Sequence, residues 1–188
     1  MGRVVAMPRI VPDNARPSAV LCLLFPMNDE LHILLMKRRE DNTAHSGQVS
    51  FPGGSYEAAD ADMRATALRE AQEEVGINSS EVDVLGALTT LYIPVSNFNV
   101  YPFVGYAHQR PVYNLSHNEV SYTIEVPLDT LLDTASKTVT DVFSPAMPDI
   151  IRKVKAYKLS DGTIIWGATA MIISELEVIL QDWNRLNK

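Results

Sequence analysis

Residues 69–77 read Arg69-Glu70-Ala71-Gln72-Glu73-Glu74-Val75-Gly76-Ile77, which places an arginine and three glutamates on two turns of a predicted helix. At about 100° per residue, the three glutamates share an arc of about 100°, opposite an apolar side. Carboxylates gathered on one face repel one another unless a cation lies between them, and hard divalent cations prefer oxygen ligands. The run therefore predicts a metal site on a helix. The other interpretation is a solvated acidic helix face, which is the usual place for such charge.

The residues around this run extend the same prediction. Helical spacing covers residues 61–75, and Gly76 is suited to end the helix. Upstream, Gly53 and Gly54 break the chain after Pro52, and they allow the backbone to approach a ligand or metal closely. Arg69 lies at the edge of the acidic face, where it is placed to fix a glutamate rotamer through a charge-assisted hydrogen bond.

The rest of the chain contains short apolar runs typical of strands and one further long helix. We predict strands at 19–25, 31–38, 47–51, 82–92, 99–106 and 119–126, a hairpin of 154–159 with 163–166, and helices at 61–75, 128–132 and 168–186. Many strands with two substantial helices indicate an α/β or α+β sandwich around a mixed sheet. We expect a single domain over residues 1–188, in which residues 1–17 form a loose N-terminal arm.

Composition excludes several functional classes. The net charge of −7 argues against broad binding to nucleic acid or to anionic membranes. No segment approaches the roughly 18 consecutive apolar residues of a membrane span. The single cysteine, Cys22, lies in an apolar run and is expected to be a buried thiol in a reducing compartment. We therefore expect a cytoplasmic protein without nucleic-acid or membrane partners, and a homodimer is one of the states that the sequence leaves open.

Residues 54–77 resemble the Nudix box, the sequence pattern of hydrolases that cut nucleoside diphosphates linked to another group. The run from Arg69 to Ile77 matches that pattern at every specified position. The first half departs from it, because one extra residue separates Gly54 from Arg69 and Asp60 stands where the family usually has glutamate. The resemblance implies a Nudix-type α/β/α sandwich with a mixed sheet and a metal-dependent hydrolase.

The longer glycine segment is similar to the Nudix branch that hydrolyses coenzyme A. That branch has an upstream pattern that is similar, in register, to residues 34–38 and to the run Gly47-Gln48-Val49-Ser50-Phe51-Pro52-Gly53-Gly54. Met36, Arg39 and Thr43 stand where the branch has a threonine, a serine and a second arginine. Weaker similarity continues downstream, so that the resemblance covers about residues 18–183.

The resemblance also implies a reaction and a role for each matching residue. The reaction is hydrolysis of the diphosphate linkage of coenzyme A or its acyl derivatives to 3′,5′-ADP and 4′-phosphopantetheine, and the substrate is a small-molecule nucleotide. Mg²⁺ or Mn²⁺ would be held mainly by Glu70 and Glu74, assisted by Glu73, with Arg69 orienting and Glu119 as a further carboxylate. Lys37, Arg38 and Arg39 would anchor substrate phosphates, although a solvated strand end is an equal interpretation, and Phe51, Gly53 and Gly54 would complete the substrate site.

Two other functions remain open from the sequence. One is a Nudix hydrolase for another nucleoside diphosphate derivative, such as ADP-ribose or a dinucleotide. The other is a non-catalytic nucleotide sensor that kept the fold. The intact Arg-Glu-X-X-Glu-Glu set disfavours the sensor, because a protein that only binds a nucleotide does not need all four groups.

Overall fold

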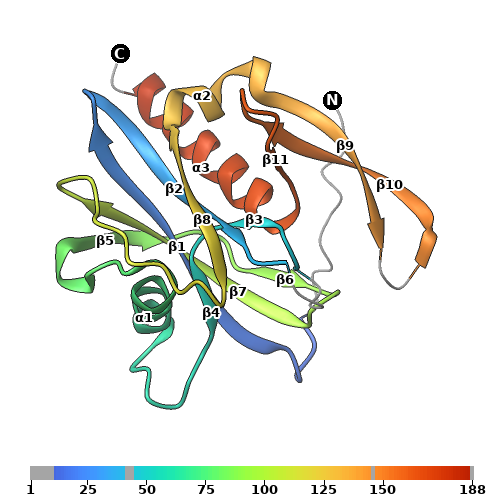
Figure 1. The fold of residues 1–188 in the computed structure, drawn as a ribbon, viewed down its shortest axis with the longest axis horizontal. Helices are drawn as coiled ribbons and strands as arrows, with labels where there is room; N and C mark the ends of the chain where they lie inside the picture. Colours follow the sequence, from blue (N-terminus) through green and yellow to red (C-terminus); the bar gives the residue numbers. More distant parts are fainter. Residues whose placement is uncertain (1–10, 41–44, 145–146, 187–188) are drawn as a thin grey trace.

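A mixed sheet between two helices forms the body of the protein, and a computed structural model describes residues 11–40, 45–144 and 147–186 of it (Figure 1). The sheet order is β3-β2-β1-β7-β5, with β4 paired to β1, β6 to β7 and β8 to β2. Its strands are β1 (Arg16–Met27), β2 (Glu30–Arg38), β3 (Val49–Ser50), β4 (Gly53–Ser55), β5 (Val82–Ala87), β6 (Leu91–Ile93), β7 (Phe98–Ala107) and β8 (Val120–Pro127). The β1–β7 pair is parallel, so the predicted mixed α+β sandwich is confirmed.

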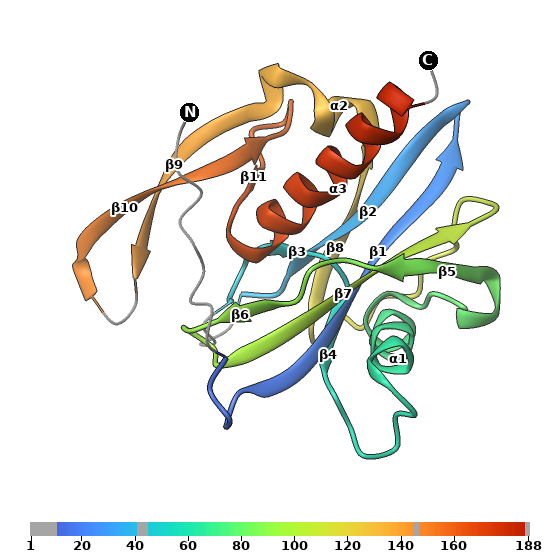
Figure 2. The same ribbon diagram turned by 180° about the vertical axis from the view of Figure 1, so that it is seen from behind.

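The two long helices lie on opposite faces of this sheet, as Figures 1 and 2 show. They are α1 (Met63–Val75) and α3 (Gly167–Leu186), and the shorter helices are η1 (Ser79–Glu81), α2 (Leu128–Leu132) and η2 (Thr134–Ser136). In β1, Leu21 and Leu23 belong to the core beneath α1, whereas Cys22 and Leu24 belong to the core beneath α3. A strand buried on both faces needs a continuous apolar run, which explains the sequence of β1. None of the described helices is long and apolar enough to span a bilayer.

Helix α1 has a defined cap at each end. The Asp62 carboxylate accepts a hydrogen bond from the backbone N–H of Ala65 at 2.8 Å, which satisfies one of the free N–H groups of the first turn. At the other end Gly76 adopts a left-handed conformation with φ of 78°, and its N–H binds the carbonyl of Gln72 at 3.0 Å. The predicted helix is confirmed, although it begins at Met63 rather than residue 61.

Two predicted boundaries are wrong. The strand predicted at 82–92 is divided into β5 and β6, and between them the Glu175 carboxylate of α3 accepts from the backbone N–H and hydroxyl of Thr89, at 2.9 and 2.7 Å. The predicted arm is too long, since Arg16 and Pro17 already pair with Phe98 and Asn99 of β7. The earlier part of the arm, residues 1–10, and Thr43 lie outside the described residues.

A second sheet, ordered β11-β10-β9, contains β9 (Lys137–Ser144), β10 (Met147–Lys158) and β11 (Ile164–Ile165). The predicted hairpin of 154–159 with 163–166 is present as β10 and β11, but β9 was not predicted. The β9–β10 hairpin projects from the α3 side of the body (Figures 1 and 2). Its base is fixed to α3, because Lys137 forms an ion pair with the buried Glu177 and the Tyr157 hydroxyl donates to the same carboxylate.

Candidate active site

Strand β4 brings two glycines against the acidic face of α1. The Gly53 N–H donates to Oε2 of Glu74 at 2.8 Å. A Cβ built on Gly53 would lie 2.3 Å from the Ala19 carbonyl oxygen, and one on Gly54 would lie 2.5 Å from the Glu70 carboxylate carbon. At Gly53 the neighbour is backbone, so the close approach of the strands requires glycine, whereas at Gly54 a side chain would displace the Glu70 carboxylate from its position.

Glu74 is the most deeply buried of the three helix acids, with 2% of its surface exposed. Its Oε1 accepts from Nη1 of Arg38 at 3.1 Å. Burial raises the pKa of Glu74 from 4.5 to about 7, against the opposing effects of the Gly53 N–H and the Arg38 guanidinium. The negative charges of Glu70 and Glu119 raise it further. Glu74 is therefore partly protonated near neutral pH when no cation is present.

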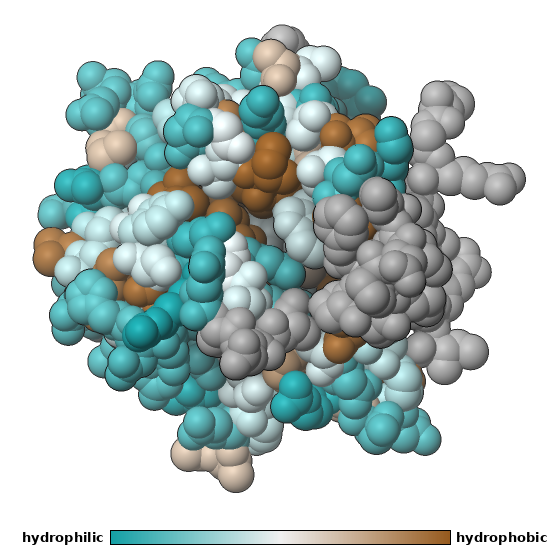
Figure 3. All heavy atoms as spheres, turned by 45° about the vertical axis from the view of Figure 1, so that its right-hand side comes forward, coloured by the Kyte–Doolittle hydropathy of each residue, from teal (hydrophilic) through white to brown (hydrophobic). Residues whose placement is uncertain are grey.

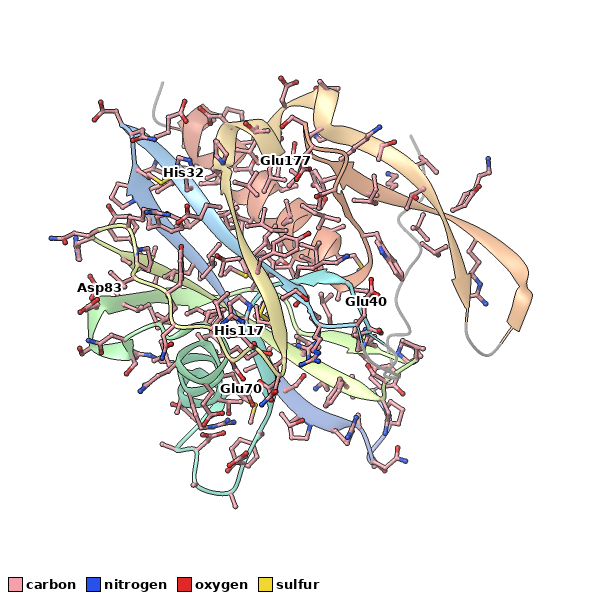
Figure 4. The ribbon with its side chains drawn as sticks, viewed as in Figure 1. His32, Glu40, Glu70, Asp83, His117 and Glu177 are labelled. Carbon is pink, nitrogen blue, oxygen red and sulfur yellow. The ribbon has the colours of Figure 1, made fainter. Side chains whose placement is uncertain are left out.

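Glu70 lies one turn before Glu74, on the side of α1 that faces β4 (Figure 4). Its Oε1 is 3.0 Å from Nη2 of Arg69. Burial raises the pKa of Glu70 more than Arg69 lowers it, and the charges of Glu73 and Glu119 add to the increase. Two neighbouring acids with raised pKa values indicate a crowded negative site that a cation would relieve.

The Arg69 guanidinium binds several of the groups that lie around Glu70. It binds Asp60 through two hydrogen bonds, Nε–Oδ1 at 2.9 Å and Nη2–Oδ2 at 3.1 Å, and also donates to the Ser55 carbonyl at 2.9 Å. It forms a further ion pair with Glu73 at 2.9 Å. Arg69 is therefore held in a fixed orientation next to Glu70 by its two hydrogen bonds to the buried carboxylate of Asp60.

Asp60 is the residue whose position the sequence did not explain. It is buried and accepts hydrogen bonds from the Thr66 hydroxyl at 2.8 Å and the Glu57 N–H at 3.0 Å, in addition to Arg69. The hydrogen bonds from Arg69 contribute most to holding the pKa of Asp60 well below its usual range. Asp60 therefore remains ionised and fixes Arg69 rather than facing Glu74.

The remaining predicted acids lie at the edge of this site. The Glu73 side chain is 58% exposed and is bound to Arg69. Glu119 is exposed and directly precedes β8, where its carbonyl accepts from the Arg39 N–H at 2.8 Å. Both are close enough for their charges to raise the pKa of Glu70.

The structure does not bring the three basic residues at the end of strand β2 into one patch, since Arg39 already follows the strand. Arg38 points toward α1 and Glu74, and it lines the substrate-sized cleft described below. Arg39 donates instead to the His117 carbonyl at 3.1 Å. Successive side chains of a strand point to opposite faces, so Lys37 lies on the face opposite Arg38.

A cleft of about 990 Å³ lies beside the two glycines, between the sheet, the start of α3 and the β9–β10 hairpin. Figure 3 shows apolar residues among hydrophilic ones on the face of the molecule that is turned toward this hairpin. Predicted site residues that line the cleft are Arg38, Phe51, Gly53 and Gly54, and it is also lined by Arg16, Phe98, Arg152 and Trp166, which were not predicted as site residues. Arg16 and Phe98 lie outside the strands predicted at 19–25 and 99–106, and only the pairing of β1 with β7 brings them together.

Comparison with known proteins identifies the family. Residues 15–146 match the model of the NUDIX domain, which is more than half of the chain. The chain belongs to the Nudix family. An uncharacterised Nudix hydrolase, NudL, from Pectobacterium atrosepticum is 36% identical over 179 residues, which cover 93% of this chain and 88% of the relative. The NudL protein of Cronobacter sakazakii is 37% identical over 167 residues, covering 87% and 82% of the two chains.

Solved structures support the same fold. A MutT/nudix family protein from Enterococcus faecalis superposes with a TM-score of 0.56 at 14% identity, over 90% of this chain and 64% of its own. A C. elegans Ap4A hydrolase superposes with a TM-score of 0.52 at 18% identity, over 60% and 80% of the two chains. At these identities the likeness concerns the fold alone.

Nudix hydrolases generally use divalent metal ions, and the donor set of this Nudix domain fits such an ion. Within the described residues, no three ligating side chains already converge on a single point. The fit rests on the half-buried Glu70 and the buried Glu74, two oxygen donors whose pKa values are raised by burial and by neighbouring negative charges. The missing side chain at Gly54 leaves Glu70 room to lie against the backbone, and Glu73 and Glu119 are the nearby acids that would complete the set.

Proposed function

We propose that this Nudix hydrolase cleaves the diphosphate linkage of coenzyme A or its acyl derivatives, giving 3′,5′-ADP and 4′-phosphopantetheine. The observation that carries the proposal is the position of the coenzyme A-like sequence pattern. Arg38, Phe51, Gly53 and Gly54 belong to that pattern, and all four line the cleft that adjoins the acidic face of α1. Its many apolar side chains suit the pantetheine arm, and its arginines suit the phosphates.

The reaction needs a water oxygen to attack one phosphorus while the bridging oxygen leaves with the other phosphoryl group. Mg²⁺ or Mn²⁺ held by Glu70 and Glu74, with Glu73 assisting, would neutralise the diphosphate and lower the pKa of the attacking water. The chain supplies the geometry, because Asp60 holds Arg69 and Arg69 holds Glu70. Glu119 is the proposed acceptor of the proton that the water loses, or a further metal ligand.

A panel of four substrates tests this assignment. Purified protein with Mg²⁺ is given coenzyme A, dephospho-coenzyme A, ADP-ribose or NADH, and the products are identified by mass spectrometry. We expect the highest kcat/KM for coenzyme A, with 3′,5′-ADP as one product. Reaction in ¹⁸O-labelled water shows which phosphorus is attacked, because that product alone carries the label.

Matched variants give the panel its controls. Glu74→Gln should remove most turnover while the fold is kept, whereas Arg64→Ala alters an exposed residue of the same helix outside the cleft and should leave turnover unchanged. Faster hydrolysis of ADP-ribose or NADH would assign the enzyme to another nucleotide. Tight binding of a nucleotide without any turnover would indicate a sensor.

A further inference from the structure

One wall of the cleft is a two-strand surface that begins at the catalytic glycines. Arg16, Ser18 and Val20 alternate along β1, so they share one face of the strand, and all three line the cleft. Val20 pairs with Gly53 of β4, and Arg16 pairs with Phe98 of β7. The four residue steps from Val20 to Arg16 span about 13 Å at about 3.3 Å per step. Arg16 thus marks the far end of a surface that starts at the catalytic site.

The charge of this cleft differs from that of the whole chain. The chain has a net charge of −7, yet three arginines line the cleft, and none of the described residues around it is Asp or Glu. Clustering of one sign of charge in a concave site raises the local concentration of ligands of the opposite sign. The cleft is therefore suited to an anion.

The three arginines differ in what they already bind. Arg38 forms an ion pair with the buried carboxylate of Glu74 at 3.1 Å, so its positive charge is already compensated by α1. Arg152 extends from the β9–β10 hairpin, on the side of the cleft formed by that hairpin rather than by β1 and β7 (Figures 1 and 2). Arg16 has no carboxylate partner in the part of the chain that the structure describes.

Arg16 is held in position by groups that leave its charge uncompensated. Its guanidinium lies 4.1 Å from the centroid of the Phe98 ring, and its Nη2 donates to the Ser96 carbonyl at 3.2 Å. Stacking on an aromatic ring fixes the plane of the guanidinium, and only one of its five N–H groups is used by Ser96. The remaining donors form the planar fork that binds phosphate oxygens in pairs.

We propose that Arg16 binds a second phosphate of the substrate, a ribose phosphate monoester that is not cleaved, and so determines specificity for nucleotides that carry one. The proposal rests on the function proposed above, in which the diphosphate lies at Gly53 and Gly54. A ribose phosphate is attached to the same nucleoside as the diphosphate, so the ligand would lie along the β1–β7 wall toward Arg16. This position replaces the Lys37-Arg38-Arg39 run as the anchor of that phosphate, because those three side chains point in different directions.

Equilibrium binding tests the proposal without depending on turnover. Calorimetry with Mg²⁺ compares 3′,5′-ADP with 5′-AMP, which differ only in the ribose phosphate. We expect wild-type protein to bind 3′,5′-ADP about 10-fold more tightly, the effect of hydrogen bonds to a charged group. Arg16→Ala should reduce this ratio to about 2-fold, and Arg16→Lys should recover part of it because the charge remains without the fork.

Two further variants make the test specific. Arg64→Ala removes the same charge from an exposed site on α1 and should keep the full ratio. Arg152→Ala removes the other cleft arginine that lacks an ion pair within the described residues, and it should also keep the ratio. Thermal unfolding of each variant confirms that the fold is intact, which we expect because Arg16 is exposed.

The results that would overturn the proposal are distinct from failure of the proposed function. Equal binding of the two nucleotides by wild-type protein, an unchanged ratio in Arg16→Ala, or loss of the ratio in Arg152→Ala would each overturn the assignment to Arg16. If wild-type protein hydrolyses neither coenzyme A nor dephospho-coenzyme A, the proposed function is wrong, and the binding ratios still decide the assignment. If it hydrolyses both, Arg16→Ala should lower kcat/KM for coenzyme A about 5-fold more than for dephospho-coenzyme A, the same factor as in the binding ratio.

Discussion

Replacing Glu74 by Gln should change how the stability of the metal-free protein depends on pH. Burial raises the pKa of Glu74 from 4.5 to about 7, so the folded protein binds this proton more tightly than the unfolded chain does. The folded state is therefore stabilised relative to the unfolded state below pH 4.5, and this advantage is lost as the pH rises from 4.5 through about 7. One pKa unit corresponds to about 1.4 kcal/mol, so ionisation of Glu74 removes about 3 kcal/mol of stability.

Glutamine cannot ionise, so the variant lacks this loss. The Gly53 N–H and Arg38 bind different oxygens of Glu74, and glutamine replaces one of these oxygens by an NH₂ group that cannot accept, so one of the two contacts is lost; protonation of Glu74 likewise weakens one of them. Near pH 5 we expect the variant and the wild type to have similar free energies of unfolding. Near pH 8 the variant should be more stable by about 3 kcal/mol.

Urea unfolding in EDTA, followed by tryptophan fluorescence, measures both free energies at each pH. Titrating groups distant from Glu74 contribute equally to both proteins and cancel in the difference, whereas Glu70 and Glu119, whose charges act on Glu74, remain part of the measured effect. Glu73→Gln removes an exposed carboxylate from the same helix and controls for the change in net charge. If the difference between Glu74→Gln and wild type changes by less than about 1 kcal/mol between pH 5 and pH 8, Glu74 ionises normally and the argument from its burial is wrong.

Three further predictions concern the same site. Asp60→Asn should destabilise the protein by about 2 kcal/mol at neutral pH and reduce turnover about 10-fold, because Arg69 loses its ionised partner. The stability difference should shrink as the pH falls below 3.8, because the unfolded wild-type chain takes up a proton at Asp60 there while the folded protein keeps this carboxylate ionised. Gly54→Ala should displace the flexible Glu70 carboxylate and lower Mg²⁺-dependent turnover, with less than about 1 kcal/mol change in the free energy of unfolding. Gly53→Ala would place its new methyl group against the Ala19 backbone, and it should lower the free energy of unfolding in urea by about 2 kcal/mol. Mg²⁺ at about 100 times its dissociation constant should raise the free energy of unfolding by about 2.7 kcal/mol. Binding should also release protons near pH 7, which calorimetry in buffers of different ionisation enthalpy would detect. The absence of both stabilisation and proton release would contradict the metal site.

The acidic helix could be predicted because the residues that define it are close together in the sequence. The spacing of Glu70, Glu73 and Glu74 fixes their common face, and Gly76 ends the helix through its own backbone conformation. The strands buried on both faces were predictable for the same reason, since their apolar runs need no knowledge of their partners. The period-two rule also separates Lys37 from Arg38, so the idea of a single basic patch on β2 contradicted a rule already available.

Other features depend on contacts between distant parts of the chain. The two glycines of β4 form a strand because β1 pairs with them, although glycine on its own indicates a chain break. Strand β9 was not predicted, and its place in the structure depends on pairing with β10 and on the ion pair between Lys137 and Glu177 of α3. The clamp between Asp60 and Arg69 joins residues nine apart, on a loop and a helix, and no local spacing rule describes it.

The net charge of the chain is a poor guide to its ligand because the charges are separated around the two glycines. The acids Glu70 and Glu74 lie on the α1 side, where a cation would bind, and the arginines line the cleft on the other side. Charges are screened over about 8 Å at physiological ionic strength, so a bound phosphate responds to the nearest side chains rather than to the total of −7. A diphosphate at Gly53 and Gly54 would therefore contact a metal ion bound by these acids on one side and guanidinium groups on the other. Under the proposed function, this separation of charge would let an acidic protein act on an anionic substrate.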